Sequence, residues 1–339
     1  MRSTTSRLSI AVSDVVPVTD RVLVTGAGGF VGRHLVDRLT DDGVDVVATD
    51  IEPEPPARFD DAVGDAVEYR TGDLTDDAFR ESLLDKRYDR VYHFAAIVGV
   101  NEYVRNPLDI VETNVEVTRK LLDAIKEWDV RFVFTSTSEV YGKNPDVPWS
   151  ETDDQVLGAP TTDRWSYSTT KAMCEHMIHG LARTDCALEA TVVRPFNLYG
   201  PEQRPDFVVP AFVEAVVNGE APTVYDDGTQ TRCFTYIDDF IEGMVRAARR
   251  PEGVNEVFNL GHTRETSITE LAETVLSVVG WDDTEPTFVD PKEVYGDGYE
   301  DLGRRVPDVS KANARLDWTA ETNLRTGLER TIEWGRENY

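Results

Sequence analysis

Short apolar runs alternate with longer amphipathic stretches along most of the chain. Five runs rich in Val, Phe and Thr predict buried strands, at residues 22–25, 44–49, 91–95, 132–136 and 191–194. Between them, apolar positions recur at helical spacing, so helices are expected to separate the strands. This alternation is typical of an α/β fold built on a doubly wound parallel sheet with helices on its faces.

The pattern changes at both ends of this stretch. Residues 1–20 are rich in Ser and Thr and lack a clear period, which predicts a loose N-terminal extension. After residue 195 the order loosens, with Gly and Pro breaks and strand-like runs at 223–225 and 257–260. We therefore expect a main domain at residues 21–195. A smaller α/β region at 196–339 would be partly interleaved with it.

The charge balance is strongly acidic. The 339 residues include 63 acidic and 35 basic ones, a formal net charge of -28, which argues against non-specific nucleic-acid binding. The acidic residues are dispersed and lysine is scarce, as on the surface of a halophilic protein. Self-repulsion this large needs screening by salt, so we expect a halophilic protein.

Other simple features exclude further classes. No apolar run has the ~20 residues that a membrane span needs, and the apolar patch at 8–12 is too short for a signal peptide, which predicts a cytoplasmic protein. The three cysteines form no CxxC pair, so neither a disulfide framework nor a zinc site is predicted. We expect no bound metal.

A glycine-rich turn joins the first predicted strand to the first helix. Gly26, Gly29 and Gly32 would allow a tight turn, approach of the backbone to a pyrophosphate, and close packing of helix on strand. The second strand ends at Asp50, where a carboxylate can accept hydrogen bonds from ribose hydroxyls. Arg33 could meet a 2′-phosphate, but Asp50 would repel that group. The motif therefore predicts NAD in preference to NADP.

A possible general base lies further along the chain. Tyr167 and Lys171 are four residues apart at the start of a helical stretch, so they share one face. A free phenol has a pKa of about 10, and a nearby cation is needed for it to act as a base at neutral pH. The strand at 132–136 leads into hydroxyl residues and Glu139 at the sheet edge where ligands bind.

With these motifs, the chain from about residue 21 to its end resembles the extended short-chain dehydrogenase/reductase superfamily of nucleotide-sugar epimerases, dehydratases and decarboxylases. The motifs that carry the resemblance follow one another in the order Gly26 to Gly32, Asp50, Asp73-Leu74, His93 to Ala96, Thr137, Tyr167, Lys171, Asn197 and Arg232. The resemblance implies a Rossmann-type fold, NAD as cofactor, a nucleotide-sugar substrate that is most often a UDP-sugar, and a homodimer.

The resemblance also implies roles for individual residues. Thr137 would hydrogen-bond the reacting sugar hydroxyl, Tyr167 would take the proton from O4, and Lys171 would lower the tyrosine pKa and hold the nicotinamide ribose. The residues expected to bind NAD are Gly26, Gly28, Gly29, Phe30, Val31, Gly32, Asp50, Asp73, Leu74, Ala95, Ala96, Tyr167 and Lys171. Those expected to bind the substrate are Thr137, Ser138, Asn197, Tyr225, Arg232 and Arg305.

The reaction that follows oxidation at C4 is the least determined feature. The 4,6-dehydratases of this superfamily carry Asp-Glu after the catalytic Thr, whereas this chain has Ser138-Glu139, which disfavours dehydration. The Thr-Ser-Glu triplet and residues 295–299 resemble UDP-glucuronate decarboxylases, but some UDP-glucose 4-epimerases share both features. We predict a UDP-glucose 4-epimerase, with Glu139 among the catalytic residues. A UDP-glucuronate decarboxylase is the alternative, ahead of a dehydratase or a non-catalytic NAD-binding regulator.

Overall fold

The computed structural model describes residues 20–59, 66–84, 87–98, 107–162, 164–290 and 302–339. Nearly all of the expected N-terminal extension and the segment 295–299 lie outside these ranges. None of the helices in the described ranges combines the length and the apolar character that crossing a membrane requires.

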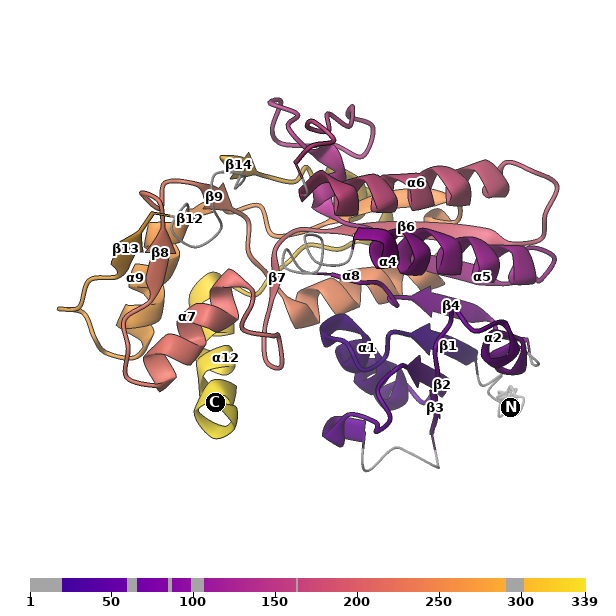
Figure 1. Cartoon of the computed structure of the whole chain (residues 1–339), viewed down its shortest axis with the longest axis horizontal. Coiled ribbons are helices and arrows are strands. Elements are labelled where there is room, and N and C mark those ends of the chain that lie inside the picture. The colour runs from indigo at the N-terminus through magenta and orange to yellow at the C-terminus, as the bar shows by residue number, and fades with distance from the viewer. Residues whose placement is uncertain (1–19, 60–65, 85–86, 99–106, 163, 291–301) are drawn as a thin grey trace, which may run out of the picture.

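Seven parallel strands form the central sheet (Figure 1). Their spatial order is β11-β6-β5-β4-β1-β2-β3, so the chain starts in the middle of the sheet and winds outward in both directions. This confirms the predicted doubly wound α/β fold of the Rossmann type. The strands are β1 (Arg21–Thr25), β2 (Asp45–Asp50), β3 (Val67–Thr71), β4 (Arg90–His93), β5 (Arg131–Thr135), β6 (Glu189–Pro195) and β11 (Glu256–Leu260).

Helices cover both faces of this sheet, which explains why its interior strands are mostly apolar. Val22 and Val24 belong to the core on one face, and Leu23 between them belongs to the core on the other face. The first face is covered by α1 (Phe30–Asp41), α8 (Ile237–Arg249) and α11 (Ser310–Leu316). The second is covered by α2 (Asp77–Leu83), α5 (Val117–Ile125) and α6 (Arg164–Ala182). Short helical segments are η1 (Ala57–Phe59), α4 (Pro107–Val111), η2 (Glu112–Glu116), η3 (Ser138–Tyr141) and η4 (Pro251–Gly253).

A smaller α/β region lies beside the carboxyl edge of the sheet (Figure 1). Its helices are α7 (Val208–Val217), α9 (Ile268–Val278) and α12 (Leu324–Asn338). Its strands are β7 (Leu198–Tyr199), β8 (Thr223–Tyr225), β9 (Thr231–Arg232), β10 (Thr235–Tyr236), β12 (Thr266–Ser267), β13 (Thr287–Val289) and β14 (Arg304–Arg305). The run at 257–260 that we expected in this region forms β11, which pairs with β6 in the main sheet.

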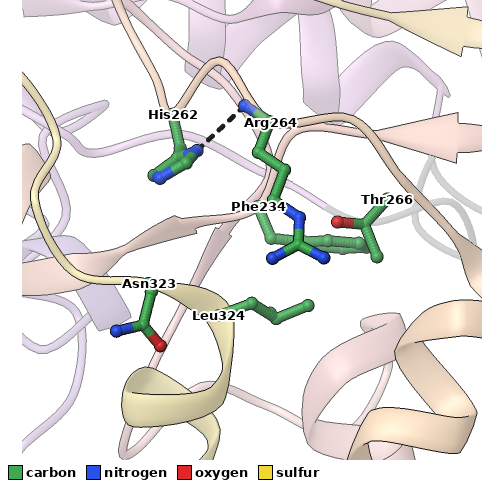
Figure 2. A pocket seen from close by; sticks show the side chains of 6 residues that line it. All are labelled: Phe234, His262, Arg264, Thr266, Asn323 and Leu324. Carbon is green, nitrogen blue, oxygen red and sulfur yellow. Dashed lines mark hydrogen bonds between the residues drawn. The ribbon is translucent and has the colours of Figure 1, made fainter.

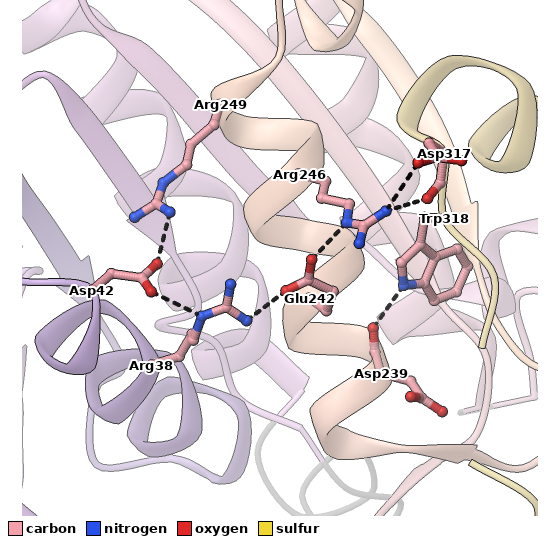
Figure 3. Close-up of polar contacts among 8 residues, drawn as sticks. All are labelled: Arg38, Asp42, Asp239, Glu242, Arg246, Arg249, Asp317 and Trp318. Carbon is pink, nitrogen blue, oxygen red and sulfur yellow. Dashed lines mark hydrogen bonds and ion pairs between the residues drawn. The ribbon is translucent and has the colours of Figure 1, made fainter. Parts of the chain in front are cut away.

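Ion pairs fasten α8 to α1, although the two helices are far apart in the sequence (Figure 3). Arg38 on α1 lies 2.5 Å from Glu242 on α8, and Arg249 at the end of α8 lies 2.7 Å from Asp42. Arg246, also on α8, forms ion pairs with both Glu242 and Asp317. These side chains are partly exposed, and Asp317 is almost fully exposed, so each pair contributes about 1 kcal/mol at most.

Candidate active site

The glycine turn after β1 has the shape that a dinucleotide needs. Gly26 has a φ of 69°, and a Cβ there would lie 2.6 Å from the backbone nitrogen of Ala95. A Cβ at Gly32 would lie 2.2 Å from the carbonyl oxygen of Gly26. Only glycine fits both places, so the turn is tight and the first helical residues come close to β1. The residues present therefore fit a pyrophosphate at the N-terminus of α1.

Asp50 lies beside this turn, at the end of β2. Its Oδ2 accepts a hydrogen bond from the backbone nitrogen of Gly28 at 2.8 Å. Arg33, the residue that could favour NADP, donates from Nε to the carbonyl oxygen of Gly28 and pairs with Glu202 at 2.8 Å. Because its guanidinium is held by these two partners, Arg33 gives little support to a 2′-phosphate site. The preference for NAD stays a prediction.

The strands next to β1 provide the rest of the expected cofactor surface. Asp73 and the buried Leu74 follow β3, and Ala95 and Ala96 follow β4. The backbone nitrogen of Ala95 donates to Thr25 Oγ1 at 3.4 Å, so these residues lie at the carboxyl edge of the sheet. All four predicted positions thus lie at the edge where a Rossmann-type fold binds its ligand.

Lys171 is buried on α6 and tied to the end of β5. Its Nζ donates to the carbonyl oxygen of Thr135 at 2.8 Å and lies 4.6 Å from the centroid of the Phe134 ring. Burial lowers the pKa of Lys171 to about 8, while Cys174 and Glu175 act in the opposite direction. The amine is therefore still mostly charged at pH 7.

Tyr167 lies one helical turn before Lys171, as the spacing predicted. Its side chain is only 8% exposed and packs against Ile110, and the Lys171 Nζ lies 6.0 Å from its ring centroid. The nearby cation favours loss of the phenolic proton, whereas burial of the ring opposes it.

Thr137 follows β5 and begins the short helix η3. Its Oγ1 accepts a hydrogen bond from the backbone nitrogen of Glu139 at 3.2 Å, and Ser138 between them is buried. Because Lys171 binds the carbonyl oxygen two residues before Thr137, the structure brings the predicted Thr, Tyr and Lys to the same strand end.

Glu139 forms ion pairs with two arginines from distant parts of the chain. Arg164 lies 3.1 Å away at the start of α6, and Arg305 lies 2.6 Å away on β14. The three side chains are only 12–19% exposed. Sequence reasoning assigned Arg305 to substrate binding and missed Arg164. The only available signal for Arg164 was its place three residues before Tyr167.

The other predicted substrate residues occupy the smaller region. Arg232 is buried on β9, in register with Arg305 on the adjacent parallel strand β14. Asn197 has a φ of 40° and its Nδ2 donates to the carbonyl oxygen of Cys233. Tyr225 lies on β8, which pairs with β13 in a separate sheet. Arg232 and Arg305 thus lie side by side on adjacent strands.

Asn114 is a further site residue that the sequence analysis missed. It lies in the π-helical turn η2, and its side chain accepts from the backbone nitrogen of Ile97 at 2.8 Å and donates to the carbonyl of Ile97 at 3.2 Å. Ile97 and Val98 pack against the cluster of Ile110 and Tyr167, so Asn114 fixes the backbone of a segment next to that cluster. A single π turn leaves no periodic mark in the sequence, although such turns are frequent at functional sites.

A small pocket in the smaller region holds none of the predicted site residues (Figure 2). His262 lies at its rim, where its Nδ1 accepts a hydrogen bond from the backbone nitrogen of Arg264 at 2.9 Å. The pocket is lined by Phe234, His262, Arg264, Thr266, Asn323 and Leu324. Across the described residues, no three His, Cys, Asp or Glu side chains gather closely enough to hold a metal ion.

The parallel sheet and the glycine turn at its carboxyl edge define a Rossmann-type dinucleotide-binding protein. The chain belongs to the NAD dependent epimerase/dehydratase family, whose sequence profile matches residues 22–261. The predicted superfamily is confirmed. NAD is also confirmed as the cofactor of the family, so the protein is an NAD-dependent enzyme of this group.

Individual relatives are similar over nearly the whole chain. The UDP-N-acetyl-alpha-D-glucosaminuronate decarboxylase of Bacillus cytotoxicus is 34% identical over 321 residues, which cover 94% of this chain and 98% of that protein. The structure of a UDP-glucose 4-epimerase from Thermotoga maritima with UDP-glucose superposes with a TM-score of 0.83 at 30% identity, covering 94% and 99% of the two chains. That of a UDP-glucuronic acid 4-epimerase from Bacillus cereus with UDP-glucuronic acid and NAD gives 0.82 at 29% identity, covering 94% and 100%.

Proposed function

We propose that this protein is a UDP-uronate decarboxylase, which oxidises C4 of the sugar and releases C6 as carbon dioxide. The observation that carries the proposal is the pairing of Glu139 with Arg164 and Arg305, at 3.1 and 2.6 Å. The three side chains carry one net positive charge next to Thr137. The sugar of a UDP-hexose is neutral, whereas a uronate adds a C6 carboxylate that this charge can bind. The similarity to the Bacillus cytotoxicus decarboxylase agrees with this choice.

Among the protein's own side chains, the first step uses those of Thr137, Tyr167 and Lys171. Thr137 holds the C4 hydroxyl, and Tyr167 removes its proton while the charge of Lys171 stabilises the tyrosinate. When bound, NAD would supply the acceptor for the C4 hydride and the source of the hydride in the final reduction. The product of this step is a 4-keto sugar with a carboxylate in the β position.

The second step is loss of the carboxylate. The C5–C6 bond breaks, carbon dioxide leaves, and the electron pair moves toward the C4 oxygen to form an enolate, which then takes a proton from water at C5. Arg164 and Arg305 bind the carboxylate beforehand. They also offset the charge of Glu139, so that the ionised Glu139 does not keep the substrate out.

The remaining substrate residues are proposed to hold the nucleotide. Arg232 would bind the diphosphate, since a guanidinium binds phosphate oxygens bidentately. Asn197 would contact the sugar-phosphate, and Tyr225 would lie toward the nucleoside. These roles follow from the resemblance to the superfamily.

The second candidate is the 4-epimerase that the sequence analysis put first. Epimerisation requires only Thr137, Tyr167 and enough space for the keto sugar to rotate in the site. The chain is also similar to the Thermotoga maritima UDP-glucose 4-epimerase. The Bacillus cereus neighbour is a UDP-glucuronic acid 4-epimerase. Binding of a uronate therefore does not by itself distinguish the two reactions.

Carbon dioxide release distinguishes them. We expect purified protein in molar KCl to release carbon dioxide from UDP-glucuronate or UDP-N-acetylglucosaminuronate, and to leave UDP-glucose unchanged. Mass spectrometry of the sugar nucleotide and a coupled carbon dioxide assay would follow the reaction. Interconversion of UDP-glucose and UDP-galactose, or epimerisation of the uronate without carbon dioxide, would instead establish the epimerase. As a matched pair, Arg305→Gln should raise KM for the uronate about tenfold or more and Arg304→Gln should not, because Arg304 is exposed and pairs with Glu265.

We also propose that the protein is halophilic. Its net charge of -28 opposes folding by self-repulsion, and the Debye length falls from about 10 Å at 0.1 M salt to about 3 Å at 1 M. Salt also weakens surface ion pairs, but each contributes only about 1 kcal/mol or less. We therefore expect the melting temperature to rise from dilute buffer to molar KCl. A flat or falling trend would contradict the proposal, and an uncharged osmolyte at equal osmolarity is the control.

The homodimer and the cytoplasmic location stay predictions. Leu108 and Val111 on α4 and Met173 on α6 are exposed apolar side chains on two helices that pack together. Such exposed groups on neighbouring helices support the proposed association of two copies.

A further inference from the structure

Residues 201–204, here called the clasp, run from one side of the cofactor surface to the other. On the α1 side, Pro201 accepts a hydrogen bond from His34 Nε2 at 3.1 Å through its carbonyl oxygen. At the far end, Arg204 donates to the carbonyl oxygen of Val98 at 3.0 Å. His34 lies in the first turns of α1, and Val98 lies in the loop after β4. The clasp therefore spans the place where the glycine turn directs a pyrophosphate.

Glu202 makes two ion pairs that attach the clasp to α1 and η1. One of its carboxylate oxygens lies 2.8 Å from Arg33 on α1, and the other lies 3.0 Å from Arg58 on η1. The Glu202 side chain is 17% exposed, so little water competes for these charges. Arg33 also donates to the carbonyl oxygen of Gly28, which connects Glu202 through one side chain to the glycine turn.

The backbone at Glu202 is in an unusual conformation. Its φ is 67°, in the left-handed region that residues with a side chain rarely adopt. A residue is kept in this conformation only when its surroundings hold it there, and such residues cluster at ligand clamps. Here the two arginines hold the carboxylate, and the conformation points it back toward α1.

We propose that Glu202 is a cofactor-retaining residue, and that the clasp slows the release of NAD by closing over its pyrophosphate. Because the hydride is returned to the sugar in every turnover, the cofactor ends each cycle as NAD. It therefore does not need to be exchanged between cycles. A clasp formed by protein groups alone fits a resident cofactor. The proposal depends on NAD binding, which the family shares, and not on which sugar reaction follows.

The test measures NAD exchange without any sugar nucleotide. Protein loaded with NAD is mixed with excess isotope-labelled NAD, and the label bound is followed over time by gel filtration at fixed KCl concentration. We expect Glu202→Gln to exchange NAD about tenfold faster than the parent, because two charge-assisted contacts are lost. We also expect it to contain less NAD when purified.

Glu242→Gln is the matched control, because Glu242 also accepts from two arginines, one of them on α1, away from the glycine turn. Its exchange should stay within about twofold of the parent. Exchange at the parent rate in Glu202→Gln, or equal acceleration in both variants, would overturn the proposal.

If Glu202→Gln proves unstable, Arg204→Ala tests the proposal in its place. The Arg204 side chain is 60% exposed, so its loss does not endanger folding. It should accelerate exchange about threefold, and an unchanged rate would count against the clasp. Failure here would leave the proposed decarboxylation untouched, because the assay involves no substrate.

Discussion

Replacement of Tyr167 by Phe is expected to lower turnover by about 10²–10⁴-fold while NAD stays bound. The hydroxyl is the proposed base, and the change removes it without emptying the space that the ring fills against Ile110. Lys171 keeps its hydrogen bond to the carbonyl oxygen of Thr135, so the cofactor side of the site should stay intact. Steady-state rates with the sugar nucleotide that the parent protein turns over, together with the NAD content of the purified variant, would measure both effects.

A tyrosine outside the site provides the comparison. Tyr88 is buried, and its hydroxyl donates to the carbonyl oxygen of Leu83 at 2.7 Å. Tyr88→Phe also removes a buried hydroxyl, so it controls for general loss of stability. We expect it to retain turnover within about twofold. A near-normal rate in Tyr167→Phe would exclude Tyr167 as the base.

The second large effect concerns stability. Glu175→Gln is expected to lower the free energy of unfolding by about 3–5 kcal/mol, because it leaves the charge of Arg194 buried without its partner. Glu175 and Arg194 approach to 2.6 Å and are each only 5% exposed. Arginine stays protonated in proteins, so Arg194 cannot escape the penalty by losing its proton. Urea unfolding in molar KCl would measure the change.

Two further variants separate the charge effect from loss of packing. Glu175→Met combined with Arg194→Met removes both charges, and it should recover most of the stability that Glu175→Gln loses. Glu270→Gln breaks the exposed pair with Arg264, and should cost less than about 1 kcal/mol. If Glu175→Gln cost no more than this surface variant, the buried pair would not matter for folding.

The fold could be predicted well where a strand is buried on both faces. The strands β1, β2, β4, β5 and β6 are nearly continuous apolar runs because helices cover both sides of them. The strand β3 was missed, because its sequence is Val-Glu-Tyr-Arg-Thr and most of its side chains are partly exposed. It lies at the edge of the sheet, where one neighbour and partial burial leave only a weak apolar pattern.

The site could be predicted where its residues are close in sequence. The glycine turn, Asp50 and the Tyr167-Lys171 pair depend on local spacing, and the structure puts them at one sheet edge. The partners of Glu139 could not be found in this way, because Arg305 reaches it from a strand near the end of the chain. That contact depends on how the smaller region docks, and no short pattern encodes it. Because of the contact between Arg305 and Glu139, decarboxylation is proposed ahead of the 4-epimerisation that the sequence predicts.

The return of the chain to the main sheet as β11 limits how the enzyme can be divided. A cut after residue 195 would remove β11 and leave β6, an apolar interior strand, as a bare edge open to self-association. It would also strip α8 from the face that it shares with α1. The smaller region is therefore not a detachable module. Exchanging it between relatives requires grafting separate segments while β11 and α8 stay with the cofactor half.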